Sequence, residues 1–286
     1  MTVDTSAYAA VLANPDDDAA RAAFAEAVGG ARGEYISLAL GRRLSKADKA
    51  RLKTLLTEHR DAWAAPLGAI RTKQRWGRGF LVQALAGDHA TAQTLAHPEW
   101  GLVEAIPGNM RLPPADHMEA LQVLATFNTS NWLRTRARPW SRLTTLTARR
   151  AEVDLLFDEP ERLPVVRTVE LYCDDDVSDD EIVRLADRLD RFDFIGRASD
   201  ATRLAVLLEL LEETKLSTLV WAPDHAICGH ATLTRGDDGR FRSFRVRRGA
   251  ENVVVLAWLR ALGPRRFDTI EVPGVDPGQW AESLRS

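Results

Sequence analysis

The chain has 286 residues, of which 45% are hydrophobic and 28% are charged, a composition ordinary for a soluble globular protein with a substantial core. Its formal net charge of -3 comes from 38 basic and 41 acidic residues. This balance argues against a protein built chiefly to hold nucleic acid or an anionic membrane surface.

The chain shows neither an apolar leader near Met1 nor an apolar run long enough to span a bilayer. We therefore expect a cytoplasmic protein with no membrane partner. Its two cysteines, Cys173 and Cys228, are expected to be free thiols in that reducing compartment. A single disulfide between them stays open as the alternative.

The N-terminal part predicts four helices. They cover Thr5–Ala13, Ala19–Val28, about Gly33–Leu44, and a segment from Ser45 towards Trp63. Asp16, Asp17 and Asp18 precede the second helix, where carboxylates cap free N–H groups and favour the helix dipole. Clustered carboxylates also hold calcium or magnesium, but no glycine and distal glutamate follow here at the spacing of a calcium loop.

Two stretches of this region carry a family pattern. The first reads Asn14-Pro15-Asp16-Asp17-Asp18, Arg21, Phe24-Ala25 and Arg32-Gly33-Glu34-Tyr35-Ile36-Ser37-Leu38, and the second reads His59-Arg60-Asp61-Ala62-Trp63, Pro66-Leu67 and Trp76-Gly77-Arg78-Gly79-Phe80. Together they resemble the bacterial repeat-companion domain, over about the first 80 residues. The chain departs from that family at Phe24-Ala25-Glu26-Ala27-Val28, where a tryptophan-containing stretch is usual. The resemblance implies a helical module that accompanies degenerate leucine-rich-like repeats, with a general interaction role and no catalytic residues.

One short apolar pattern recurs from Leu143 to Val272. An apolar residue, two variable residues, a second apolar residue, one variable residue and a third mostly apolar residue occur at Leu143/Leu146/Ala148, Val166/Val169/Leu171, Leu216/Leu219/Trp221, Phe241/Phe244/Val246 and Phe267/Ile270/Val272, with a degraded copy at Phe192/Ile195/Arg197. Earlier copies at Phe80 and Trp100 extend the pattern. Its period of about 23 to 26 positions lies within the window of leucine-rich-type repeats, in which each unit is a short strand with a return segment.

The segments between these copies predict the return elements of the repeat. Helices are expected over Asp88–Ala96, over Ala115–Phe127, from Ser178 with Glu181 at the capping-box position, over Ala201–Thr214 and over Val253–Leu262. Ala226–Arg240 instead predicts a hairpin around the Gly236-Asp237-Asp238-Gly239 turn. Asn128–Pro139 is either an inserted loop or a worn repeat around Trp132-Leu133.

We therefore predict an α/β fold, in which an N-terminal helical repeat-companion module over residues 1–74 is followed by an irregular leucine-rich-repeat-like solenoid with a mainly parallel sheet over residues 75–286. In such units the second and third apolar residues point into the core, and the variable residues face outward along the strands. The outward residues predicted to bind a partner are Thr145, Thr147, Thr168, Glu170, Thr218, Val220, Ser243 and Arg245. Phe194 also faces outward in this scheme. A purely structural sheet surface would have the same mostly small polar character.

Other groups of residues are of types that can have a chemical role, and each also has a purely structural explanation. His225, Cys228 and His230 are zinc-ligand types without an obvious fourth ligand, and a buried thiol with surface imidazoles is the alternative. Cys173 adjoins the acidic run Asp174–Glu181, whose carboxylates oppose the thiolate that a nucleophile needs. The structural interpretation of the acidic run is a polar loop followed by a helix cap. The functional alternatives are a weak divalent-cation site and a docking patch for a basic partner.

Arginines cluster at Arg134–Arg138 and Arg240–Arg248, which invites a nucleic-acid interpretation. However, Phe241 and Phe244 occupy core positions of the repeat, so they are not free to stack on bases. The chain has no Walker loop, no dinucleotide fingerprint, no Gly-x-Ser-x-Gly elbow and no His-Glu-x-x-His motif. We expect no enzyme activity, no catalytic residues, no metal and no cofactor.

These observations favour a non-catalytic interaction or scaffold protein that binds another protein through the strand-lined face of the solenoid. One alternative is an accessory nucleic-acid-binding protein that uses Arg240–Arg248. Another is a regulated target or substrate of a protease in a bacterial stress or defence pathway, cut in exposed segments such as Asn128–Pro139 or Asp174–Asp180. The identity of the partner and the oligomeric state do not follow from the sequence.

Overall fold

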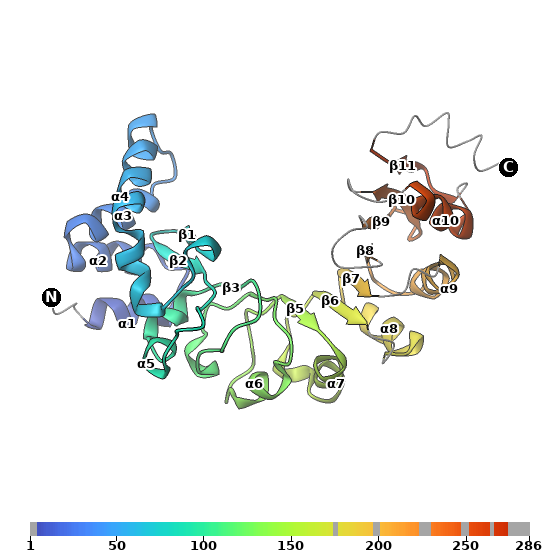
Figure 1. Cartoon of the computed structure of the whole chain (residues 1–286), viewed down its shortest axis with the longest axis horizontal. Helices are drawn as coiled ribbons and strands as arrows, with labels where there is room; N and C mark the ends of the chain where they lie inside the picture. The colour runs from blue at the N-terminus through green and yellow to red at the C-terminus, as the bar shows by residue number, and fades with distance from the viewer. Residues whose placement is uncertain are drawn as a thin grey trace. The chain divides into compact units, whose positions relative to one another are not determined.

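A computed structural model of the chain describes residues 5–173, 177–196, 201–222, 230–246, 252–263 and 266–273. The fold is mixed α/β, with helices and strands alternating along much of the chain (Figure 1). In this described part the strands follow one another in the sheet in chain order, from β1 to β11, and most neighbouring pairs are parallel. The predicted α/β class with a mainly parallel sheet is therefore confirmed.

The chain divides into two compact units, each described below by itself. The first unit runs to Leu143 and also includes Glu159–Val165; the second comprises Thr144–Asp158 and the described residues from Val166 onward. The boundary predicted after residue 74 separates helices from strands and is a different kind of division. It stays a prediction.

Four helices open the first unit: α1 (Thr5–Ala13), α2 (Asp18–Val28), α3 (Gly30–Ala39) and α4 (Lys46–Ala64). The Asp17 carboxylate caps α2 by accepting the N–H groups of Ala19 and Ala20, and a reciprocal capping box of Ser45 and Asp48 starts α4. Both predicted helix starts are confirmed. The predicted Gly33–Leu44 helix begins and ends earlier than expected.

The early start of α3 has a backbone cause. Gly29 and Gly30 have φ values of 56° and 57°, so the chain reverses between α2 and α3 within two residues that carry no Cβ atom. Gly33 then allows the two helices to approach closely, since a Cβ atom there would lie 2.3 Å from the Ala25 carbonyl oxygen. The core of this helical region joins Val11, Phe24, Ala25, Ile36, Phe80 and Leu102.

The rest of the first unit contains short strands and helices: β1 (Arg75–Gly77), β2 (Phe80–Gln83), α5 (Ala92–Leu95), β3 (Ala105–Ile106), β4 (Val123–Leu124) and α6 (Ser130–Thr135). Single 3-10 turns lie at Ala65–Leu67, Arg71–Lys73, Pro98–Leu102, Ala115–His117 and Pro160–Arg162. β1 and β2 form a hairpin, and β2, β3 and β4 are parallel.

Two predictions in this region are wrong. The predicted Ala115–Phe127 helix is a 3-10 turn followed by β4, because Val123 and Leu124 pair with β3 and the buried Leu121 and Leu124 fit the repeat pattern instead of a helical stripe. Asn128–Pro139 is neither an inserted loop nor a worn repeat strand. It contains α6, which follows β4 as its return helix and buries Leu133.

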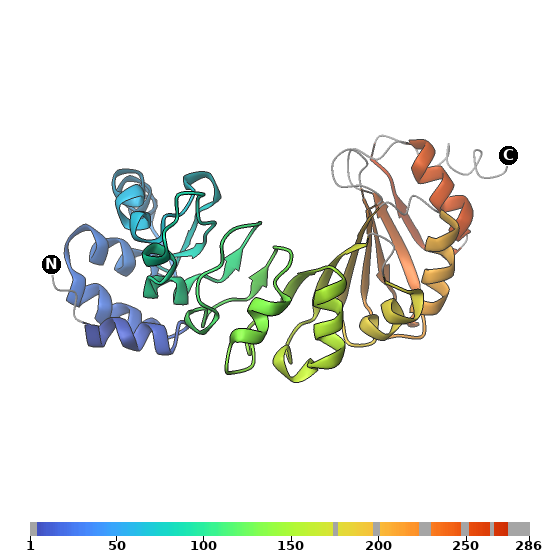
Figure 2. The ribbon, with the colours of Figure 1, turned by 60° about the horizontal axis from the view of Figure 1, so that its bottom comes forward.

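The second unit contains β5 (Thr145–Ala148), α7 (Arg150–Asp158), β6 (Thr168–Cys173), α8 (Asp179–Ala186), β7 (Arg191–Gly196), α9 (Ala201–Leu211), β8 (Thr218–Ala222), β9 (Ala231–Arg235), β10 (Phe241–Val246), α10 (Asn252–Leu262) and β11 (Thr269–Glu271). Strands β5 to β8 are parallel, and the predicted hairpin is confirmed in β9 and β10. Helices α7 to α10 lie on the same side of these strands (Figure 1), and Figure 2 shows the strands from a second direction.

Strand pairing fixes the register of the repeat pattern in this unit. Leu146 pairs with Val169, Val169 with Phe192, and Phe192 with Leu219, and all four side chains are buried. These middle residues are separated by 23, 23 and 27 positions. The degraded copy predicted at Phe192/Ile195/Arg197 is therefore wrong. With Phe192 as the middle residue, the copy of the pattern is Leu189/Phe192/Phe194, and all three side chains are apolar and buried.

Candidate functional sites

The first candidate site is the side of the second unit's sheet that lies opposite α7 to α10. Two rows of side chains cross its strands in register. The first row is Thr145, Thr168, Arg191, Thr218, Thr234, Ser243 and Thr269, and the second is Thr147, Glu170, Asp193, Val220, Thr232, Arg245 and Glu271. We call these two rows the open face. All eight residues predicted to bind a partner lie on it, although Thr147 and Val220 are only 3% and 4% exposed. Their binding role stays a prediction.

The first row is dominated by hydroxyl groups. Thr145, Thr168, Thr218, Thr234 and Ser243 are half-buried. None of these five hydroxyls has a protein hydrogen-bond partner within the described ranges of the chain. A hydroxyl donates one hydrogen bond and accepts up to two, so the row presents donors and acceptors to whatever lies above it.

The charges of the open face are held in pairs. Arg191 donates two hydrogen bonds to Asp193 at 2.7 and 2.9 Å, and Arg245 donates two to Glu271 at 2.6 and 2.9 Å. The hydrogen bond from Arg245 lowers the pKa of the Glu271 carboxyl and keeps that pair ionised. The two rows together carry two arginines and three carboxylates, which makes the face polar but close to neutral.

On β7 the sequence placed one outward residue wrongly and missed two, and on β9 it did not identify Thr232 and Thr234. Phe194 does not face outward; it is 1% exposed, and its ring stacks on Trp221 at 4.6 Å between centroids and 7° between planes. Arg191 and Asp193 occupy the outward positions of β7 instead. The signal that could have found them is the alternative copy beginning at Leu189, which also fits the pattern.

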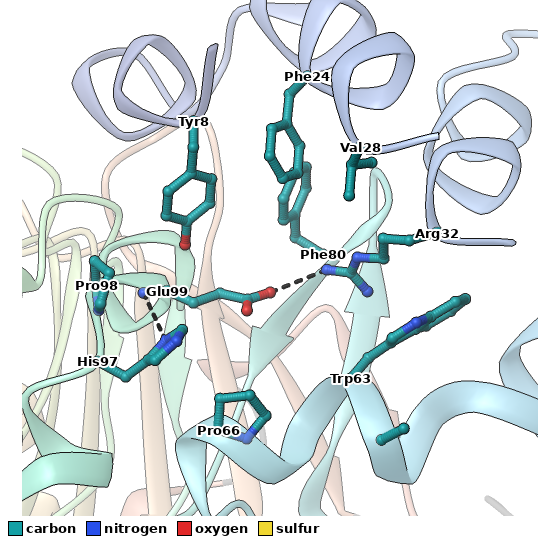
Figure 3. A pocket seen from close by; sticks show the side chains of 11 residues that line it. Tyr8, Phe24, Val28, Arg32, Trp63, Pro66, Phe80, His97, Pro98 and Glu99 are labelled. Atoms are coloured by element: carbon teal, nitrogen blue, oxygen red, sulfur yellow. Dashed lines mark hydrogen bonds and ion pairs between the residues drawn. The ribbon is translucent and has the colours of Figure 1, made fainter. Parts of the chain in front are cut away.

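The second candidate site is a cavity of about 390 Å³ in the first unit. We call it the aromatic pocket. It is lined by Tyr8, Phe24, Val28, Arg32, Ala62, Trp63, Pro66, Phe80, His97, Pro98 and Glu99, which come from the four N-terminal helices, the turn after α4, strand β2 and the 3-10 turn near His97 (Figure 3). Phe24 and Phe80 are buried, while Ala62, Pro66 and Pro98 are exposed at its rim.

An ion pair crosses the aromatic pocket. The Arg32 guanidinium donates to the Glu99 carboxylate at 3.0 Å, and the two side chains are only 14% and 13% exposed (Figure 3). The guanidinium also lies over the rings of Trp63 and Phe80, at 4.8 and 5.3 Å from their centroids. Burial raises the pKa of Glu99 and lowers the pKa of Arg32, because it disfavours both charged forms.

The aromatic pocket contains buried polar atoms without a hydrogen-bond partner in the described residues, and a histidine whose tautomer is set by a hydrogen bond. The Nη1 atom of Arg32 and the hydroxyl of Tyr8 are buried without a hydrogen-bond partner in the described residues. Burial raises the pKa of Tyr8 well above its ordinary value, so its hydroxyl stays protonated. His97 accepts the Glu99 backbone N–H at its Nδ1 atom, which puts the proton of the neutral ring on Nε2.

The sequence did not point to the aromatic pocket. Arg32, Trp63 and Phe80 belong to the stretches that resemble the repeat-companion domain, but nothing in the chain linked them to Tyr8 or Glu99. Buried side chains from separate elements form such a site only in space. The available signal was the occurrence of a glutamate between Pro98 and Trp100, in an otherwise apolar segment.

The other charged clusters of the sequence are engaged in the fold. Asp16 and Asp18 form ion pairs with Arg78, and Asp16 also pairs with Arg142. Hydrogen bonding by Arg142 lowers the pKa of Asp16. Asp17 therefore caps α2, and the ion pairs of Asp16 and Asp18 link the start of this helix to Arg78 and Arg142. In the described part of the chain, no group of three or more His, Cys, Asp or Glu side chains is placed to hold a metal ion.

The remaining predicted candidates lie partly outside the described residues. His225, Cys228, Asp174–Asp176 and Arg247-Arg248 are not described, and the side chain of Cys173 is not described either. In the described part of the acidic run, Ser178 and Glu181 form the predicted capping box of α8. Glu181 also accepts from Arg150, and these bonds lower its pKa to about 2.

The chain matches no protein-family model, and neither a curated protein nor a solved structure shows significant similarity to it. Of the helices that the structure describes, none combines the length and the apolar character needed to cross a membrane. The function is therefore argued from the two sites themselves.

Proposed function

We propose that the chain is a degenerate leucine-rich-repeat-like solenoid preceded by a helical repeat-companion module, and that it binds another protein through the open face without catalysing a reaction. One observation carries the proposal. Helices α7 to α10 cover one side of the second unit's sheet, and no described element of that unit covers the two rows on the other side. Repeat proteins use such strand-lined surfaces for recognition.

The regular arrangement of strands supports the solenoid part of the proposal. Each strand pairs with its neighbours in the sequence, and a helix returns the chain between most consecutive parallel strands. The spacing of 23, 23 and 27 positions between the middle residues is that of leucine-rich-type units. Neighbouring units of this kind bury one another's apolar faces and leave the opposite side of the sheet to solvent.

The chemistry of the open face favours one kind of partner. Its hydroxyl row offers hydrogen bonds, and its arginines are already paired with carboxylates. A surface with balanced, paired charges gives little long-range attraction to a polyanion or to a strongly basic chain. The partner that fits is a polar, nearly neutral protein surface that exchanges hydrogen bonds with the row of threonines.

The nucleic-acid alternative has less support. Within the described residues of the Arg240–Arg248 stretch, Arg242 is bound to Asp238 and Arg245 to Glu271. Phe241 and Phe244 are completely buried, so neither ring is available to a base. A mobility-shift titration with single-stranded RNA at low salt tests the alternative, and we expect no shift.

The protease-target alternative has less support at Asn128–Pro139, one of the segments named for it. Asn128–Pro139 was expected as an exposed loop, but it contains α6, and the indole N–H of Trp140 donates to the Leu133 carbonyl at 3.0 Å. The buried Arg136 is also bound, through an ion pair with Glu119. A helix anchored in this way is a poor protease substrate. We expect limited proteolysis to leave α6 intact.

Site-specific photo-crosslinking tests the proposal. A photoreactive amino acid is introduced at Thr145 or at Ser243 on the open face, and at the exposed Glu209 of α9 as the control on the helical side of the same unit. Irradiation in cells that produce the protein should yield the same crosslinked protein from both open-face positions and none from position 209. Crosslinks of equal yield from position 209, or different products from the two open-face positions, would show that the open face is not the binding surface.

A further inference from the structure

The aromatic pocket lies in the first unit and is independent of the open face. It combines aromatic walls with buried polar atoms that have no hydrogen-bond partner among the residues that the structure describes. Buried donors are nearly always hydrogen-bonded in folded proteins, so the Arg32 Nη1 atom and the Tyr8 hydroxyl require an explanation. Both belong to residues that line the same cavity. The cavity volume of about 390 Å³ lies in the range of small-molecule sites.

The polar atoms of the pocket are mostly donors. Arg32 Nη1 carries two N–H groups, the Tyr8 hydroxyl carries one proton, and the neutral ring of His97 carries its proton on Nε2. Figure 3 shows the hydroxyl of Tyr8 directed towards Glu99 and the guanidinium of Arg32 on the other side of the same cavity. A molecule that satisfies these groups must therefore present acceptor atoms, such as a carbonyl oxygen.

The charge of the pocket argues for a neutral molecule. Arg32 and Glu99 already neutralise each other, so an anion would leave an excess negative charge beside the buried Glu99. A cation would meet the guanidinium of Arg32, which already occupies the faces of Trp63 and Phe80. Neither kind of ion gains a free partner of opposite charge.

We propose that the aromatic pocket binds a small, flat, neutral molecule with a carbonyl acceptor, such as an aromatic amide or lactam. Its ring packs against Tyr8 and Phe24, and its carbonyl oxygen accepts a hydrogen bond from Arg32 Nη1. The ion pair with Glu99 stays intact and holds the guanidinium in place. Binding at this site is recognition of an uncharged ligand through one oriented donor group.

Three matched probes test the proposal on the full chain: benzamide, benzoate and benzylamine, which are neutral, anionic and cationic at neutral pH. Their binding is measured by ligand-observed NMR titration. Benzamide should bind with a dissociation constant on the order of 1 mM, and the two ions should bind at least tenfold more weakly, a difference of about 1.4 kcal/mol. Equal or tighter binding of either ion, or no benzamide signal at about 10 mM, overturns the proposal.

Two variants on one helix locate the binding. Ala62 lies at the rim of the pocket in α4, and Ala50 is exposed elsewhere on α4. Ala62→Trp should abolish the benzamide signal, Ala50→Trp should keep it, and neither should shift the thermal transition. Benzamide binding that survives Ala62→Trp would place the ligand elsewhere and refute the assignment.

Discussion

Replacing Phe194 by alanine is expected to destabilise the second unit far more than replacing its neighbour Ile195. Phe194 is 1% exposed and stacks on Trp221, whereas Ile195 is half-buried and pairs with Tyr172 and Ala222 on the open side of the sheet. Truncating a buried phenylalanine removes its transfer free energy and leaves a cavity, at a cost of about 3–5 kcal/mol. The stacked pair accounts for about 0.5–1.5 kcal/mol of this cost.

The truncation of Ile195 should cost about 1 kcal/mol. Guanidinium unfolding followed by far-ultraviolet circular dichroism measures both free energies of unfolding. Tryptophan fluorescence is a poor probe here, because the emission of Trp221 would change directly when its neighbour Phe194 is removed. The milder pair Phe194→Leu and Ile195→Val keeps the comparison if an alanine variant does not fold. An Ile195 variant that loses as much free energy of unfolding as the Phe194 variant would refute the register and, with it, the composition of the open face.

Three further substitutions test the first unit and the helix caps. Gly33→Ala should lower the melting temperature of the first unit, because its Cβ atom would lie 2.3 Å from the Ala25 carbonyl oxygen; an unchanged transition would contradict the close packing of α2 on α3. Glu99→Gln tests the buried carboxyl, whose pKa is raised by burial, so that folding favours its protonated form. The wild-type protein should therefore be most stable relative to this variant below the ordinary pKa of 4.5 and lose that advantage as pH rises through the raised value; a stability difference independent of pH would speak against it. Ser178→Ala should cost about 1 kcal/mol of unfolding free energy, since it removes the N-cap of α8, and a cost near zero in denaturant titrations would rule out the capping box.

Much of the helical part follows from local chemistry. The Asp17 cap of α2, the Ser45 capping box of α4 and the Ser178 capping box of α8 all lie where polar side chains precede an apolar helical stripe. The parallel strands were predictable from the recurring apolar pattern. The caps depend on a few neighbouring residues, and the strands depend on a short apolar frame that recurs along the chain, so the sequence carries both signals.

The errors arose where one spacing fits two structures. Leu121 and Leu124 are three residues apart, which suits a helical stripe and the repeat pattern equally, and pairing of β4 with β3 decides between them. Phe192 likewise begins one copy of the pattern and forms the middle of another, and only the register with Val169 selects the second. A two-residue strand such as β4 has too few residues to show its own alternation.

The aromatic pocket shows the other limit of sequence reasoning. Arg32 and Glu99 are 67 positions apart, and the pocket also draws on α1 and α4. No local period links residues in separate elements. The unpartnered Nη1 atom is a property of the packed structure, since a guanidinium in an unfolded chain is hydrated on every side.

The central claim is that the open face binds a protein, and the most direct measurement is the affinity of the crosslinked partner for a charged double variant. Thr168→Glu and Thr218→Glu place carboxylates on either side of Arg191 in the first row, where opposite charges across strands do not destabilise the sheet. Thr54→Glu on the exposed surface of α4 is the matched control. By isothermal titration calorimetry, the double variant should lose at least roughly tenfold in affinity, about 1.4 kcal/mol, with an unchanged thermal transition, while the control binds like the wild type. Unchanged affinity of the double variant would contradict the claim.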